Sequence, residues 1–419
     1  MTAEATIQAI DVFVALVTLA ALVGLVVRRL AIPYSVALVV LGVVVAAILP
    51  IELEVTPELV LLVLLPGLVF EAALRIDIGD FRRTFGGVVL LAAPGVLISA
   101  AVVAIVLNVA TGLPVVLGFV VGAMVAATDP VAVVSTFKQL GSPRRLATLI
   151  ESESLFNDGT AIVVFAIAVK AATGPVTLVD AVLSAVTIVA FSVAIGAAVG
   201  FVASRLIASV DDHLMELTLS VVAAYGTYLL ADRLHESGII ATVVAGLLIG
   251  DHARRAGMKR ESLEALDTVW EFFAFLVTAL VFLLIGLAIS FGDLLTAFPS
   301  IAWGVLAILV GRAIVVYGLL GGASRLTILT GHRRGVPMAW LHVLFWAGLR
   351  GAVAIALALS LPTDFPQRGL LQEITFGIVL FTLLVQGTTV EALIRRVGAG
   401  RPTVPAAGSA ATAAEPPVE

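Results

Sequence analysis

The chain has 419 residues, no cysteine and few charged residues. The absence of cysteine excludes disulfides, thiolate metal sites and cysteine nucleophiles. Charged residues make up only 13% of the chain, whereas an average soluble domain contains about 25%. A chain this poor in charge is not a soluble globular protein, and its breaks between apolar segments are too short to hold a soluble domain.

Long apolar segments take the place of the missing charge. Hydrophobic residues make up 61% of the chain, and the mean hydropathy is +1.16. A membrane-spanning helix needs about 20 mostly apolar residues, and blocks of that length follow one another from Ile7 to Val397. We therefore predict an all-α integral membrane protein with about 13 transmembrane helices. The expected spans lie near residues 7–27, 34–49, 57–73, 86–108, 114–135, 148–170, 178–207, 214–231, 237–250, 264–291, 297–320, 336–361 and 371–394.

Positive charge collects in alternate loops between these spans. Cytoplasmic loops of membrane proteins carry an excess of Lys and Arg, so the basic loops are predicted to face the cytoplasm, with the N-terminus outside and the C-terminus inside. The residues concerned are Arg28, Arg29, Arg75, Arg82, Arg83, Lys138, Arg144, Arg145, Arg205, Arg254, Arg255, Lys259, Arg260, Arg325, Arg333, Arg334, Arg395, Arg396 and Arg401.

The span order also predicts an internal repeat. When the first six spans are matched to the last six, each pair crosses the membrane in opposite directions, which is the arrangement of inverted repeats in transporters. Residues 1–397 then form one transmembrane domain. Residues 398–419 are rich in Ala and Pro without apolar periodicity, and we expect them to form a disordered cytoplasmic tail.

Asp129 lies inside an otherwise apolar span and directly precedes Pro130. A proline removes a backbone donor and disfavours helical geometry at the residue before it. The helix is therefore predicted to break next to Thr128 and Asp129, at membrane depth. Unwound backbone at that depth is tolerated where it is buried or lines a cavity, and in transporters it coordinates ions.

The following span contains a second polar cluster. Glu151, Ser154 and Asp158 share one helix face, and Glu153 and Asn157 form an adjacent stripe. At 1.5 Å per residue, Asp158 lies roughly 15 Å from the start of the span, near the bilayer midplane. Carboxylate, hydroxyl and amide oxygens are ligands for a hard cation. A lone buried acid is often a paired structural residue, but a cluster in two consecutive spans favours a functional site.

Basic and acidic residues elsewhere at membrane depth need partners. Arg350 lies between Gly348 and Gly351 in the twelfth span, which is the fifth element of the second half, and the glycines predict a second break there. We expect Arg350 to be neutralised by Glu153 and to act as structural support and charge balance. Arg312 and Glu71 are weaker candidates; Glu71 and Glu151 are read as residues of a cytoplasmic entrance.

Three of these runs resemble the NhaP-type sodium/proton antiporters, members of the monovalent cation:proton antiporter family and relatives of the animal sodium/proton exchangers. The runs are Thr128-Asp129-Pro130, Glu153-Ser154-Leu155-Phe156-Asn157-Asp158-Gly159 and Gly348-Leu349-Arg350-Gly351. The resemblance implies a homodimer with interface helices and a six-helix transport bundle in which two broken helices cross. Mapped onto this chain, the interface helices are about 7–73 and 178–291, and the bundle is about 86–170 and 297–394.

The resemblance also implies roles for the clustered residues. Asp158 is expected to bind the cation or the proton, with Ser154 and the Thr128 carbonyl as further Na⁺ ligands. Asp129 is expected to shape the site, Asn157 to accompany Asp158, and Glu153 to pair with Arg350. The neighbouring Asn157 and Asp158, in place of two aspartates, are typical of the electroneutral branch that exchanges one cation for one proton.

We thus expect a secondary active antiporter in the cell (inner) membrane that exchanges Na⁺ or Li⁺ for H⁺, with no cofactor and no nucleic-acid partner, in contact with lipid and as a homodimer. A K⁺/H⁺ antiporter on the same scaffold stays open, because these ligands fix charge and hardness but not cavity size. An intramembrane aspartyl protease and a channel are the alternatives from other classes. The protease is disfavoured because the chain has no Gly-x-Gly-Asp run and carries the Arg350 charge.

Overall fold

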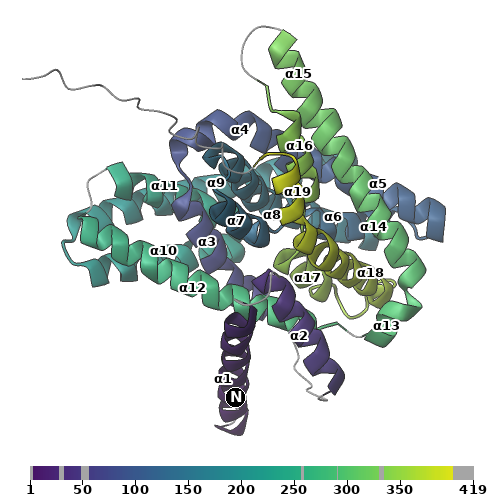
Figure 1. The fold of residues 1–419 in the computed structure, drawn as a ribbon, viewed down its shortest axis with the longest axis horizontal. Coiled ribbons are helices and arrows are strands. Elements are labelled where there is room, and N and C mark those ends of the chain that lie inside the picture. The colour runs from purple at the N-terminus through teal and green to yellow at the C-terminus, as the bar shows by residue number, and fades with distance from the viewer. Residues whose placement is uncertain are drawn as a thin grey trace, which may run out of the picture.

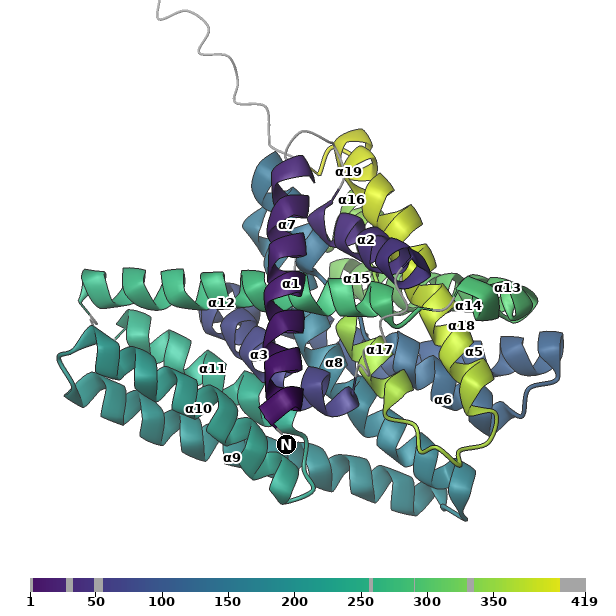
Figure 2. The ribbon, with the colours of Figure 1, turned by 90° about the horizontal axis from the view of Figure 1, so that it is seen from below.

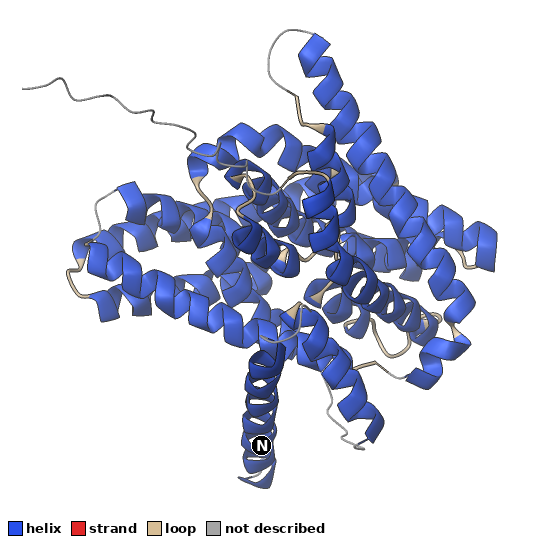
Figure 3. Cartoon of the chain, in the orientation of Figure 1, coloured by secondary structure: helices blue, strands red, loops and turns tan. Residues whose placement is uncertain are grey.

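The structure is a computed structural model that describes residues 3–27, 33–48, 56–255, 259–289, 291–329 and 335–399. Within these ranges the regular structure is entirely helical (Figure 3). Seven helical stretches there are long and apolar enough to cross a membrane, and shorter apolar helices accompany them. Each of the 13 predicted spans coincides with a helix or with consecutive helical pieces. The predicted fold class is confirmed, whereas the predicted tail beyond Ala399 lies outside the described residues.

The helices have the following bounds. They are α1 (Ala3–Val27), α2 (Tyr34–Ile48), α3 (Leu65–Arg75), α4 (Ile78–Ala92), α5 (Pro94–Thr111), α6 (Val115–Ala126), α7 (Val131–Leu140), α8 (Arg144–Thr173), α9 (Leu178–Ser209), α10 (His213–Arg233), α11 (Gly238–Arg255), α12 (Arg260–Leu287), α13 (Phe291–Thr296), α14 (Phe298–Ala313), α15 (Gly321–Leu329), α16 (Met338–Trp346), α17 (Ala352–Leu359), α18 (Arg368–Phe381) and α19 (Gly387–Arg396). The π-helical stretches η1 (Leu59–Leu64), η2 (Ile314–Leu320) and η3 (Thr382–Gln386) run directly into α3, α15 and α19.

Packing divides the helices into two groups. The scaffold group comprises α1–α3 and α9–α12, where α2 packs on α12, and α3 and α9 pack on α11. The bundle group comprises α4–α8 and α13–α19, where α5 packs on α6 and α14, and α8 packs on α4 and α6. Figure 1 shows α10, α11 and α12 on one side of the molecule and α5, α14 and α18 on the other. In Figure 2, α1 lies across α12.

Glycine allows the backbones to approach closely inside each group. A Cβ atom at Gly42 of α2 would lie 2.8 Å from the Cα atom of Gly286 in α12. In the bundle group, a Cβ atom at Gly122 of α6 would lie 2.6 Å from the Cα atom of Ala100 in α5. Helices that associate within a bilayer use small residues at such crossings because close van der Waals packing replaces the hydrophobic driving force.

Two helices are broken where the sequence predicts breaks. α6 ends at Ala126 and α7 begins at Val131, with Thr128 and Asp129 between them; α16 ends at Trp346 and α17 begins at Ala352. The two breaks touch, because the Asp129 N–H donates to the Leu349 carbonyl at 2.8 Å. A Cβ atom at Gly351 would lie 2.8 Å from the Asp129 Cβ atom. Glycine at 351 is therefore what lets the second break pass the first.

Arg350 closes the end of α6 rather than pairing with an acid. Its side chain is 2% exposed, and its Nη1 atom donates to the carbonyls of Ala126 and Ala127 at 3.0 and 3.1 Å. Its own N–H donates to the Thr382 hydroxyl at 3.0 Å. The last carbonyls of a helix have no partners within the helix and carry partial negative charge. Arg350 supplies hydrogen bonds to two of them from a buried position.

The predicted ion pair between Glu153 and Arg350 is wrong, because Glu153 pairs with Arg312 of α14. Both Arg312 guanidinium Nη atoms contact the Glu153 carboxylate, with Nη2 and Oε2 3.0 Å apart. Arg312 Nη2 also donates to the Leu344 carbonyl of α16 at 2.9 Å. A Cβ atom at Gly348 would lie 3.1 Å from Arg312 Nε, so glycine at 348 leaves room for this guanidinium. The pair joins α8, α14 and α16.

Breaking this pair should destabilise the fold, because either partner alone is an uncompensated buried charge. We expect Glu153→Leu and Arg312→Met each to lower the free energy of unfolding by about 3–5 kcal/mol, and the double variant to recover most of that loss. Thermal unfolding of the purified variants in detergent measures this change in stability.

Glu391→Ala is the matched control, because it removes an exposed pair in which Glu391 contacts Arg395 at 2.8 Å. Glu391→Ala should lower the free energy of unfolding by less than about 1 kcal/mol. A double variant that loses the sum of the two single losses would contradict the pairing.

Candidate ion-binding site

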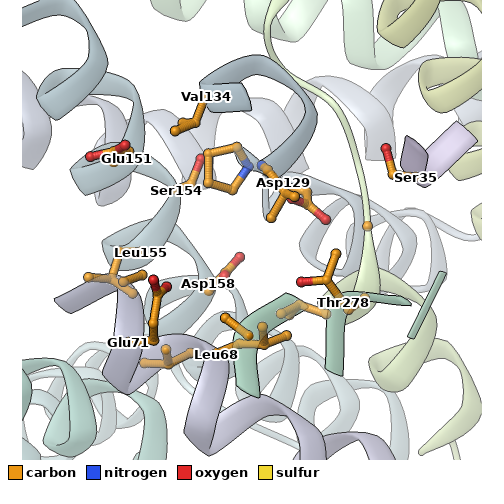
Figure 4. A pocket seen from close by; sticks show the side chains of 18 of the residues that line it. Ser35, Leu68, Glu71, Asp129, Val134, Glu151, Ser154, Leu155, Asp158 and Thr278 are labelled. Atoms are coloured by element: carbon orange, nitrogen blue, oxygen red, sulfur yellow. The ribbon is translucent and has the colours of Figure 1, made fainter. Parts of the chain in front are cut away.

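A cavity of about 580 Å³ lies between the scaffold group and the two breaks. Its walls come from α3, α8 and α12, from the start of α2, and from the segments around Asp129 and Gly351. Figure 4 shows the Asp158, Asp129 and Thr278 side chains around the same open space, with Glu71 and Glu151 farther from its centre. The cavity thus brings the first break, the predicted acidic face of α8 and the scaffold together.

Three neutral side chains tie the first break to α8. The Asn157 amide donates to the Thr128 hydroxyl at 2.7 Å, and its carbonyl oxygen accepts from the Thr128 N–H at 3.2 Å. The Thr128 hydroxyl also lies 2.9 Å from the Ser154 hydroxyl. All three side chains are buried. Asn157 therefore holds Thr128 by two hydrogen bonds, donating through its amide nitrogen and accepting through its amide oxygen.

Asp158 lies one residue beyond Asn157, and its carboxylate differs from every other acid of the cluster. It lines the cavity and is partly exposed. Among the residues that the structure describes, no hydrogen bond or ion pair holds its oxygens, and Figure 4 shows them directed into the open space. Ser154 lines the cavity one turn before Asp158, as the i, i+4 spacing predicts.

Asp129 uses part of its carboxylate to stabilise the local backbone. One carboxylate oxygen accepts from the Val131 N–H at 2.9 Å, at the start of α7. A negative charge at a helix N-terminus is favourable there because the first N–H groups of the helix have no partners within it. The same side chain packs against Gly351 and lines the cavity. The expectation that Asp129 shapes the site stays a prediction.

The two entrance residues predicted from the sequence, Glu71 and Glu151, both line the cavity. Glu71 forms an ion pair with Arg75 at 2.7 Å, and Arg75 also contacts Glu271 of α12 at 3.2 Å. Sequence reasoning placed Arg75 among the loop charges and missed Glu271. The signal available for Glu271 was an acid in an apolar segment, seven residues before Thr278 and therefore on the same helix face.

The arrangement suits an alkali cation and a proton as alternative occupants. Within the described residues, the Asp158 carboxylate has no hydrogen bond or ion pair, and it shares the cavity with Ser154 and Thr128, whose oxygens are hard donors. No cluster of three or more His, Asp or Glu side chains that could hold a metal ion occurs in the part of the chain that the structure describes. The roles of Asp158, Ser154 and Thr128 as Na⁺ ligands stay a prediction.

Comparison with known proteins identifies a family and several relatives of this chain. A family model described as "Sodium/hydrogen exchanger, transmembrane" matches residues 15–396. The chain is 39% identical to the Na⁺/H⁺ antiporter ApNhaP of Aphanothece halophytica over 88% of this chain and 70% of that protein. It is 34% identical to the Na⁺/H⁺ antiporter NhaH of Halobacillus dabanensis over 93% of this chain and 98% of that protein.

A solved structure shares the fold. The sodium proton antiporter MjNhaP1 of Methanocaldococcus jannaschii, at pH 8, superimposes with a TM-score of 0.78 at 21% sequence identity, covering 94% of this chain and 99% of that one. The two chains therefore share their overall fold. With a family model that spans nearly all of the described helices, the chain belongs to the transmembrane sodium/hydrogen exchanger family.

Proposed function

We propose that this protein exchanges one Na⁺ for one H⁺ across the membrane, with both ions competing for the Asp158 carboxylate. The observation that carries the proposal is the Asp158 side chain, which has no hydrogen bond or ion pair within the described residues and faces a cavity that Ser154 and Thr128 also line. The relatives named above are Na⁺/H⁺ antiporters, which supports Na⁺ as the cation. Family membership also makes the chain a transporter rather than a protease.

Competition at a single carboxylate is enough to couple the two ions. The carboxylate holds either a proton or a cation, so the site can carry one ion in each direction and never both. The charge of the loaded site is then the same with either ion, which makes a one-for-one exchange electroneutral. Glu153 does not add a second exchangeable charge, because Arg312 neutralises it.

Movement of one helix group against the other would expose the site to alternate sides. We assign the scaffold group to the interface helices (about 7–73 and 178–291) and the bundle group to the transport domain (about 86–170 and 297–394). The packing supports this division, because Asp158 and both breaks belong to the bundle group while α3 and α12 form the opposite wall. In this scheme the scaffold helices form the homodimer contact, in the cell (inner) membrane with the C-terminus in the cytoplasm.

The proposal is tested by Na⁺-driven proton movement in proteoliposomes. Because the exchange is electroneutral, we expect the pH change to be unaffected when K⁺ and valinomycin clamp the membrane potential. Asp158→Asn should abolish it, since an amide neither binds a proton at neutral pH nor provides negative charge. Thr227→Val, on a scaffold helix away from the cavity, is the control and should keep wild-type rates.

The alternatives have distinct outcomes in the same vesicles. A response to K⁺ but not Na⁺ would keep the site and change the substrate to that of a K⁺/H⁺ antiporter. A current carried down the gradient would indicate a channel. Na⁺-driven exchange that persists in Asp158→Asn would overturn the assignment of the site.

Competition also predicts a pH dependence of the apparent KM for Na⁺. Where Asp158 is mostly protonated, the apparent KM should rise by about tenfold for each unit of falling pH, because one proton must leave for each cation that binds. The maximal rate at saturating Na⁺ should change far less. Initial rates at several Na⁺ concentrations between pH 6 and 9 measure this, and a KM that is constant with pH would show that proton and cation bind at separate sites.

A further inference from the structure

One face of α12 lines the cavity from Glu271 to Thr278. The residues are Glu271, Ala274, Phe275 and Thr278, and their i, i+3, i+4, i+7 spacing is that of a single helix face. Glu271 is exposed and ion-paired with Arg75, whereas Thr278 is 9% exposed. The face thus runs from a charged residue at the outer end to a single hydroxyl at the buried end.

The opposite wall repeats this pattern. On α8 the cavity is lined by Glu151, Ser154, Leu155 and Asp158, again at i, i+3, i+4 and i+7. Seven residues of α-helix span about 10.5 Å. Each helix thus presents to the cavity an acid seven residues before a second polar residue, which is Thr278 on α12 and Asp158 on α8. Figure 4 shows Thr278 across the open space from Ser154, with its hydroxyl directed toward the carboxylates of Asp158 and Asp129.

The Thr278 hydroxyl is also free to interact with an occupant of the cavity. Buried threonines in helices usually donate to the carbonyl four residues earlier, as Thr227 does to Ala223 at 2.6 Å and Thr375 to Leu371 at 2.8 Å. Within the described residues Thr278 makes no such bond, and its hydroxyl faces the space that Asp158 faces. A polar group at that depth without a partner is costly unless it serves a ligand or water.

We infer that Thr278 contributes a neutral oxygen to the transported cation from the scaffold wall, across the cavity from Asp158, in the conformation described. This rests on the proposed function and extends its ligand set beyond α8 and the first break. A hard cation that leaves water needs several oxygen donors, and the walls around Asp158 supply them from one side. Because α12 belongs to the scaffold group, the contact is lost when the bundle moves, so Thr278 affects cation affinity on one side of the membrane.

The test compares Thr278→Val, which keeps the side-chain shape and removes the hydroxyl, with Thr278→Ser, which keeps the hydroxyl. In proteoliposomes, Na⁺ is supplied to the face of the membrane at which Glu71 and Glu151 form the predicted cytoplasmic entrance. There, Thr278→Val should raise the KM for Na⁺ by about three- to tenfold, which is the effect of losing one neutral oxygen contact. The maximal rate should stay within about twofold. Thr278→Ser should retain the wild-type KM, and the control Thr227→Val should leave it unchanged.

The side dependence is the second readout. With Na⁺ supplied to the opposite face, Thr278→Val should have the wild-type KM, whereas a general loss of structure would affect both faces and lower the thermal unfolding midpoint. An unchanged KM on both faces, or an equal rise in Thr278→Ser, would overturn the inference. If Asp158→Asn is inactive and Thr278→Val is unaffected, the proposed function stands and this inference alone fails. If the wild-type protein shows no Na⁺-driven exchange, the proposed function itself fails.

Discussion

The backbone of a broken helix must find hydrogen-bond partners inside the bilayer, and the rest of this structure depends on how that requirement is met. No water is available in the hydrocarbon core to satisfy free carbonyl and N–H groups. Here each break supplies hydrogen-bond partners to the other. The Asp129 N–H donates to the Leu349 carbonyl, and the Arg350 side chain donates to the carbonyls that end α6. The crossing is therefore held by directional bonds between the two breaks, and the cavity beside it keeps a defined shape.

The charges near the crossing have separate functions because each has a different partner. Glu153 is neutralised by Arg312. Arg350 donates hydrogen bonds to backbone carbonyls, and one Asp129 oxygen caps the N-terminus of α7. Asp158 is left without a hydrogen bond or ion pair among the described residues, although it lies five residues after Glu153 on the same helix. A buried charge is costly unless it is paired, so a carboxylate left open to a cavity is available to a proton or a cation. The paired charges hold the site, and the unpaired one is free to exchange ions.

The sequence predicts much of this because the determining signals are local. Pro130 identifies the first break through its missing N–H, the glycines around Arg350 identify the second, and helical spacing places Ser154 and Asp158 on one face. The partner of Glu153 is not a local property. Arg312 and Arg350 are both arginines inside apolar spans, and the choice between them depends on how α14 packs beside α8. Thr278 was missed for a similar reason, since a threonine in an apolar helix normally bonds to its own backbone, and its exposure to the cavity appears only when α12 faces α8.

The most direct test of the account is the proton balance of Na⁺ binding. Isothermal titration of Na⁺ into the purified protein, in buffers with different enthalpies of ionisation, gives the number of protons released per chain at each pH. If Na⁺ and H⁺ compete for Asp158, the release approaches one proton per chain as the pH falls, and Asp158→Asn releases none. Sodium binding with the same heat in every buffer, across the pH range in which the protein is active, would contradict it.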